Sequence, residues 1–75
     1  MSKKKLVNKI IKEIKPAMYK KIISHKGNLL DDHLLDSFDI IQICLKIEKY
    51  KKKKINISNY KRKNFSTLDE ILKII

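Results

Sequence analysis

The 75 residues, 43% of them hydrophobic, make one small domain with room for a single core and none for a deep catalytic cleft. The single cysteine excludes an internal disulfide and a cysteine-only metal site, and one glycine and one proline favour helices over a turn-rich sheet protein. The formal net charge of +11 is the unusual property, because it is typical of proteins that bind nucleic acid or anionic membranes. A coding bias toward Lys, Ile and Asn stays open as a blander cause.

The first predicted element is a helix from about Lys3 to Lys15, with Ser2 available as its cap. Its apolar stripe comprises Leu6, Val7, Ile10, Ile11 and Ile14. We interpret it as part of a small bundle rather than a membrane-surface helix, because the rest of the chain supplies a core for it. Pro16 disfavours helix at the residue before it and is expected to end the element, with a kinked continuation through residues 17–23 as the alternative.

Residues 16–35 are expected to form a long connection that apolar side chains anchor on the core. These anchors are Met18, Tyr19, Ile22, Ile23, Leu29 and Leu30. The connection turns at residues 24–28, where Gly27 is able to adopt a positive φ. A general base at His33, or a metal site of His33, His25 and Asp32, has little support, because neither has the usual spacing or a third triad member.

The central predicted helix runs from Asp36 to Tyr50. Its apolar residues, expected to cover one broad face, are Ile40, Ile41, Ile43, Cys44, Leu45 and Ile47. The opposite stripe comprises Asp39, Gln42, Lys46 and Lys49. With Asp36 as the N-cap, Asp39 takes the third helical position, where the helix dipole favours a carboxylate. The hydroxyl of Ser37 then stands free beside backbone amides that favour phosphate. Cys44 is interpreted as a small core residue.

The remaining residues predict a solvated lysine run at 51–54, an extended stretch and a last helix. Ile55 and Ile57 are expected to turn inward, and Ser58 to cap a short helical turn through residues 59–62. Two caps compete for the last helix: Ser66 with Asp69, or Thr67 with Glu70. The helix is expected to continue to the C-terminus on a buried stripe of Leu68, Ile71, Leu72 and Ile75.

Two segments carry a resemblance to a known family: residues 34–41, LLDSFDII, preceded by Asp31 and Asp32, and residues 64–71, NFSTLDEI. The chain resembles the phosphopantetheine-binding carriers, which comprise acyl, peptidyl and aminoacyl carrier proteins. The resemblance covers essentially the whole chain. It implies an all-α fold, a small four-helix bundle of acyl-carrier type with three longer helices, one short helix and a long first loop. Residues 1–75 then form a single carrier domain. Many members of the family have a glycine where this chain has His33, so the resemblance implies that His33 is left-handed or that the loop bends differently.

The resemblance implies that Ser37 carries 4'-phosphopantetheine, attached by a separate phosphopantetheinyl transferase. The thiol of this arm holds cargo as a thioester, so the chain is a tethered substrate and not an enzyme. A loading ligase and a downstream transferase or synthase are the other expected partners. The implied recognition residues are Asp36, Phe38, Asp39, Ile41, Gln42 and Lys46. Asp36 would help to position the transferase or its metal, and Phe38 would lie beside the arm.

The charge pattern departs from that of acidic housekeeping fatty-acid carriers, although Asp31, Asp32, Asp36 and Asp39 form a local acidic cluster. The lysines that follow favour a stand-alone carrier of a dedicated biosynthetic pathway with less basic partners. We expect a cytoplasmic monomer without a signal peptide or membrane span. The alternative is a small basic helical nucleic-acid-binding protein, against which stand the scattered lysines, the single Arg62 and the absence of an aromatic platform. A third class is an adaptor that does not need Ser37.

Overall fold

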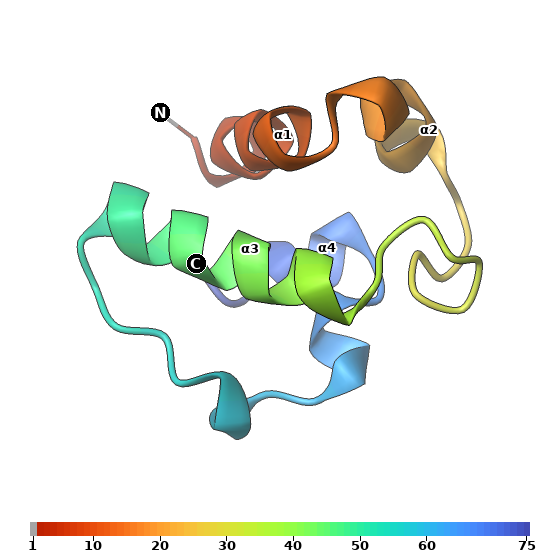
Figure 1. The fold of residues 1–75 in the computed structure, drawn as a ribbon. Coiled ribbons are helices and arrows are strands. Elements are labelled where there is room, and N and C mark those ends of the chain that lie inside the picture. The colour runs from red at the N-terminus through yellow and green to blue at the C-terminus, as the bar shows by residue number, and fades with distance from the viewer. Residues whose placement is uncertain (1) are drawn as a thin grey trace.

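The chain folds into two long helices that are joined and closed by short ones (Figure 1). The computed structural model describes residues 2–75, and within this range it contains helices and no β-strand. The α-helices are α1 (Lys3–Ile14), α2 (Tyr19–Ser24), α3 (Ser37–Lys51) and α4 (Leu68–Leu72). The 3₁₀ helices are η1 (Pro16–Met18), η2 (Ile57–Asn59) and η3 (Arg62–Phe65). The all-helical prediction is confirmed, but two helices are long where three were expected.

Helix α1 has the boundaries that the sequence predicts. The Ser2 hydroxyl accepts a hydrogen bond from the backbone N–H of Lys5 at 3.2 Å, which makes Ser2 the N-cap. Pro16 ends the helix and opens η1, a place that suits proline because a first-turn N–H has no helical partner. A helix then resumes at Tyr19. Residues 16–24 are therefore largely helical, and the kinked continuation describes them better than a plain connection.

The second half of the connection is a loop held against the core. Leu29, Leu30 and Leu35 are buried, and the Leu29 N–H donates to the Ser66 carbonyl oxygen at 2.7 Å. His33 is left-handed with φ 61°, as anticipated, whereas Gly27 has no positive φ. A Cβ at residue 27 would lie 2.7 Å from Asp32 Oδ2, so glycine provides space here rather than a special dihedral angle.

The segment after α3 differs from its prediction in two details. Lys52, with φ 53°, ends α3 in the left-handed conformation. Ile55 packs against the core as expected, but Ile57 is 40% exposed. The helical turn at η2 begins one residue before Ser58, and its cap is Asn56, whose Oδ1 accepts from the Ser58 N–H.

Helix α4 is shorter than its apolar stripe suggests. Of the two competing caps, Thr67 is the one used: its Oγ1 accepts from the Glu70 N–H at 3.1 Å. The helix ends at Leu72, because the next two amides bond three residues back, Lys73 to Glu70 and Ile74 to Ile71. This tighter turn brings Ile74 and Ile75 into the core, so the predicted helix to the C-terminus is wrong beyond Leu72.

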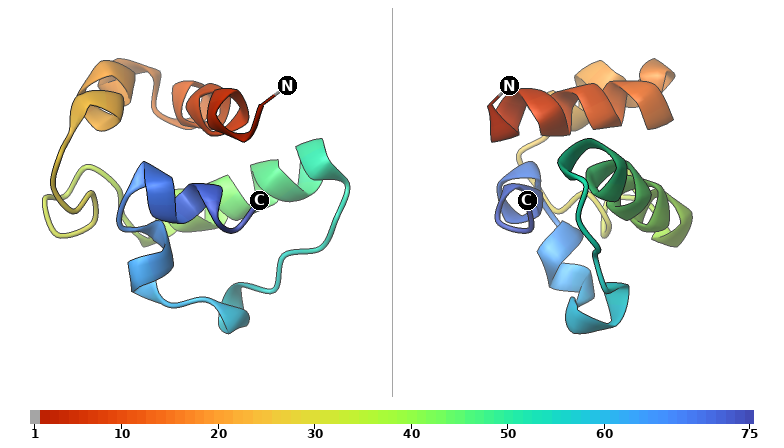
Figure 2. Two further views of the ribbon diagram at one scale, coloured as in Figure 1. Left: turned by 180° about the vertical axis from the view of Figure 1, so that it is seen from behind. Right: turned by 90° about the vertical axis from the view of Figure 1, so that its left-hand side faces the viewer.

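The core lies where α1 crosses over α3 and α4, which run beside each other beneath it (Figure 2). The buried apolar residues of these helices are Leu6, Val7, Ile10 and Ile11 of α1, Ile43, Cys44 and Ile47 of α3, and Ile71 of α4. Phe65 of η3 closes the core from below. Within residues 2–75 no helix is long and apolar enough to cross a membrane, and no group of three His, Cys, Asp or Glu side chains lies close enough to hold a metal ion.

Candidate functional site at the start of α3

The first turn of α3 is fixed by a reciprocal pair of capping bonds. Asp36 Oδ1 accepts from the Asp39 N–H at 3.0 Å, and Asp39 Oδ2 accepts from the Asp36 N–H at 3.0 Å. The bond from the Asp39 N–H, followed by smaller contributions, holds the pKa of the Asp36 carboxyl below its usual value. Asp36 is thus the N-cap and Asp39 the third helical residue, as predicted, and neither bond uses the Ser37 hydroxyl.

Asp39 also receives a lysine from the far end of α1. Lys15 Nζ lies 3.0 Å from Asp39 Oδ2 and 3.1 Å from the Leu34 carbonyl oxygen. Asp39 is only 6% exposed as a result. Its predicted place in a solvent-facing recognition stripe is therefore wrong: Asp39 joins α1, the connection and α3 from inside. The periodicity of α3 could not reveal this, because the residue that covers Asp39 lies 24 positions away.

The acidic cluster predicted around Ser37 is partly offset by basic residues of the fold. Asp31 lies 3.7 Å from Arg62, Asp32 lies 2.6 Å from His25 Nε2, and Asp39 pairs with Lys15. Asp36 is occupied by the capping bonds. Lys15 and Arg62 thus offset two of the four carboxylates, whereas Asp36 keeps its negative charge because a hydrogen bond from an amide does not neutralise a carboxylate.

Ser37 is exposed at the edge of a small hollow between α3 and the segment that carries η2 and η3. The hollow measures about 220 Å³ and is lined by Ser37, Ile40, Ile57, Tyr60, Lys61, Arg62 and Phe65. Its rings meet edge to face, with the centroids of Tyr60 and Phe65 6.2 Å apart. Four of these lining residues come from the segment after α3 and were not among the predicted site residues: Ile57, Tyr60, Lys61 and Arg62. The sequence did not reveal them, because residues in this irregular segment have no periodicity that shows what they face.

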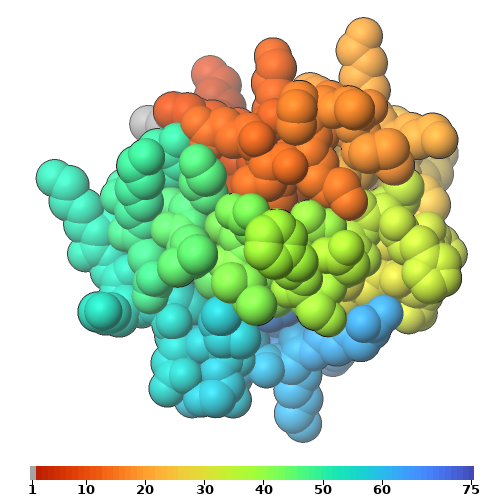
Figure 3. Space-filling view, in the orientation of Figure 1, coloured from red at the N-terminus to blue at the C-terminus, as the bar shows by residue number. Residues whose placement is uncertain are grey.

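The apolar residues of α3 divide between two faces. Ile43, Cys44 and Ile47 are buried, whereas Phe38, Ile41 and Leu45 are 64%, 45% and 56% exposed. The single broad face predicted from the sequence is therefore wrong at Ile41 and Leu45. The exposure of Phe38 and Ile41 is compatible with their predicted role in recognition. Helix α3 crosses the middle of the face shown in Figure 3, with α1 above it.

The two polar recognition residues are less free than predicted. Gln42 is half-buried, and so is Lys46, whose Nζ lies 3.5 Å from Glu13 Oε1 on α1. Glu13 also accepts a hydrogen bond from the Tyr50 hydroxyl, at 2.7 Å to Oε2, and this bond is the main cause that lowers the pKa of Glu13. Lys46 therefore contributes to the packing of α1 on α3 as well as to the surface.

Cys44 is confirmed as a core residue. It is 1% exposed, and burial, with a smaller effect from Glu48, raises the pKa of its thiol to about 11. A neutral, enclosed thiol is a poor nucleophile. Cys44 therefore does not offer a reactive thiol.

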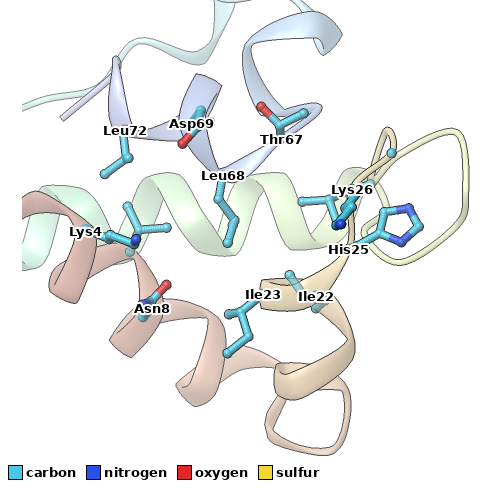
Figure 4. Close-up of a pocket in the computed structure, with 13 residues that line it drawn as sticks. Lys4, Asn8, Ile22, Ile23, His25, Lys26, Thr67, Leu68, Asp69 and Leu72 are labelled. Atoms are coloured by element: carbon cyan, nitrogen blue, oxygen red, sulfur yellow. The ribbon is translucent and has the colours of Figure 1, made fainter.

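A larger hollow of about 390 Å³ lies between α1, α2 and α4 (Figure 4). Its floor is apolar, with Val7, Ile22 and Leu68 among the lining residues, and Lys4, Lys26 and Asp69 stand at its rim. None of its lining residues belongs to α3, so it is separate from the hollow at Ser37.

No protein-family model, curated protein or solved structure matches this chain. The residues at the start of α3 therefore carry the assignment of function.

Proposed function

We propose that this chain is a stand-alone carrier of acyl or aminoacyl groups, with Ser37 as the attachment residue for 4'-phosphopantetheine. The observation that carries the proposal is that Asp36 caps α3 while its neighbour Ser37 takes no part in the cap. Asp36 and Asp39 satisfy the first turn of α3, which leaves the Ser37 hydroxyl exposed at the first helical position. A serine used as the cap would have its oxygen occupied instead.

The surroundings of Ser37 suit a phosphodiester. Backbone amides at the start of a helix, together with the helix dipole, favour a phosphate group. Lys61 and Arg62 line the same hollow, and Lys61 adds positive charge there, whereas Arg62 is paired with Asp31. The arm itself, when attached, supplies the thiol that holds cargo as a thioester. The protein residues hold the attachment point and leave the loading and transfer of cargo to partner enzymes, whose local supply of cargo the tether raises.

The proposal includes the acyl-carrier type of bundle. Its support is the order of the elements: α1, a long connection, α3 opening with Asp-Ser-Phe, a short helical segment and α4. Two features depart from the expected pattern, namely the helix α2 inside the connection and the short α4. The proposal also takes the chain to be a cytoplasmic monomer that serves a dedicated pathway and not housekeeping fatty-acid synthesis.

Nucleic-acid binding is the second candidate, and one observation favours it. Within residues 2–75, ion pairs to carboxylates involve four of the 19 lysine and arginine side chains, Lys15, Lys46, Arg62 and Lys73. The other cationic side chains remain able to attract phosphates. They are spread over α1, α2, α3 and the loops instead of gathering along one groove-sized element.

The test is the intact mass of the protein after incubation with coenzyme A, magnesium and a broad-specificity phosphopantetheinyl transferase. We expect a gain of one phosphopantetheine, no gain for Ser37→Ala, and an unchanged gain for Ser58→Ala, which removes another exposed serine hydroxyl. No gain with several transferases would overturn the proposal. Nucleic-acid affinity across a salt series then tests the second candidate, because each phosphate contact steepens the salt dependence.

A further inference from the structure

The outer face of α3 exposes more apolar surface than its fold requires. Phe38, Ile41 and Leu45 follow one another at intervals of three and four residues, so they share one side of the helix. We call these three residues the outer stripe. Across residues 2–75 only two other large hydrophobic side chains are comparably exposed, Ile23 and Ile57, and Ile57 lines the hollow at Ser37. Exposed apolar residues that cluster in this way mark interaction surfaces.

Positive charge frames the outer stripe at both ends. Lys49 continues its side of the helix beyond Leu45, Lys52 follows as the residue that ends the helix, and both are exposed. Lys61 and Arg62 lie at the opposite end, in the hollow beside Ser37. Asp31 offsets Arg62 at 3.7 Å, whereas Lys49, Lys52 and Lys61 form no ion pair within residues 2–75.

We propose that the outer stripe is the docking face for a protein whose surface offers an apolar groove bordered by Asp and Glu side chains. The inference rests on the proposed function in one respect, since an enzyme that serves Ser37 must approach this end of α3. Phe38 and Leu45 anchor the complex in the groove, and the lysines pair with the acidic border. The partner is thus recognised by negative charge.

Other occupants fit the face less well. A second copy of this chain brings a net charge of +11 against an equal charge, which opposes association. The phosphates of a nucleic acid would attract the lysines, but a nucleic acid has no apolar groove to cover the apolar side chains of the outer stripe. An anionic membrane would accept both the stripe and the lysines, but it would hold the exposed Ser37 hydroxyl against lipid head groups, away from an enzyme.

The experiment titrates the full, ¹⁵N-labelled protein with three probes and follows its amide signals. Two probes are synthetic helical-hairpin peptides with the same leucine-lined groove between their helices, one groove flanked by Glu and the other by Lys, and the third is vesicles of phosphatidylglycerol. We expect the Glu-flanked peptide to shift the amides of residues 37–49 and the Lys-flanked peptide not to do so. Phe38→Ala and Leu45→Ala should each weaken binding about tenfold, while Ile23→Ala, which removes an exposed side chain of α2, leaves it unchanged.

Three results would overturn the inference: equal binding of the two peptides, equal loss from Ile23→Ala, or a stronger response of the same amides to the vesicles. The last result would assign the face to a membrane. Salt of about 1 M, where the Debye length is about 3 Å, should weaken the Glu-flanked complex but leave its apolar contacts. The mass assay on Ser37 is independent of these titrations, so failure of docking and failure of the carrier proposal are distinguishable.

Discussion

The two faces of α3 have similar composition but different surroundings. Ile43 and Ile47 are sealed beneath α1, whereas Ile41 and Leu45 stand in solvent on the same helix. Helical spacing groups all of these residues as apolar, but only the positions of the other helices decide which of them become core. The difference shows that a helix with more apolar residues than its buried face can hold has an apolar contact surface on its exposed side as well as a face in the core. The following predictions separate the two.

The largest effect is expected from the buried face. Ile47→Ala removes a side chain that is 0% exposed and should cost about 2–5 kcal/mol of unfolding free energy. Leu45, on the outer face of the same helix, is 56% exposed, so Leu45→Ala should change the unfolding free energy by less than about 0.5 kcal/mol. Urea denaturation followed by circular dichroism measures both. Equal losses from the two variants would mean that the outer stripe is packed in solution.

The next effect concerns the ion pair that covers the polar side of the helix. A double-mutant cycle of Lys15→Met and Asp39→Asn should give a coupling of roughly 1–2 kcal/mol, because the carboxylate is enclosed and its lysine is partly screened by water. Lys46→Met with Glu13→Gln is the matched control, since that pair is longer at 3.5 Å. A control coupling as large as that of Lys15 with Asp39 would contradict the enclosed arrangement.

A smaller effect distinguishes the cap from the proposed attachment residue. Asp36→Ala should lower the denaturation midpoint, because the Asp39 N–H loses its acceptor. Ser37→Ala should leave the midpoint unchanged, since the capping bonds do not use its hydroxyl. A loss from Ser37→Ala as large as that from Asp36→Ala would show that the hydroxyl has a structural task and is not free for modification.

The smallest effect is the pH dependence of that cap. The pKa of Asp36 in the folded protein lies below its ordinary value of 3.8, so its contribution to stability is complete above that value. The contribution is lost as the pH falls through the lowered pKa. We therefore expect the stability difference between wild type and Asp36→Asn to shrink in acid, measured by urea denaturation across a pH series. A difference that grows as the pH falls would contradict a lowered pKa.

The sequence was sufficient for features that depend on local spacing. The start of α1, the cap at Asp36 and the buried Cys44 each follow from neighbours in the chain, and the left-handed His33 follows from the resemblance. Features decided by distant residues were missed. Asp39 is enclosed by Lys15 and Asp31 is paired with Arg62 across the fold. Helix α4 ends at Leu72, and the turn that follows brings Ile74 and Ile75 into the core. The periodic pattern of the sequence does not predict where this helix ends.

The connection between α2 and α3 has a consequence for how the molecule moves. Buried leucines at 29, 30 and 35 hold it inside, the Leu29 amide bonds to Ser66, and Lys15 binds the Leu34 carbonyl oxygen shortly before α3. A loop with so many anchors does not open as a lid, because its release exposes core surface. The bonded amide protons of Leu29, Leu34 and Leu35 therefore exchange with solvent mainly when the whole domain unfolds, and the start of α3 keeps a constant shape for whatever approaches it.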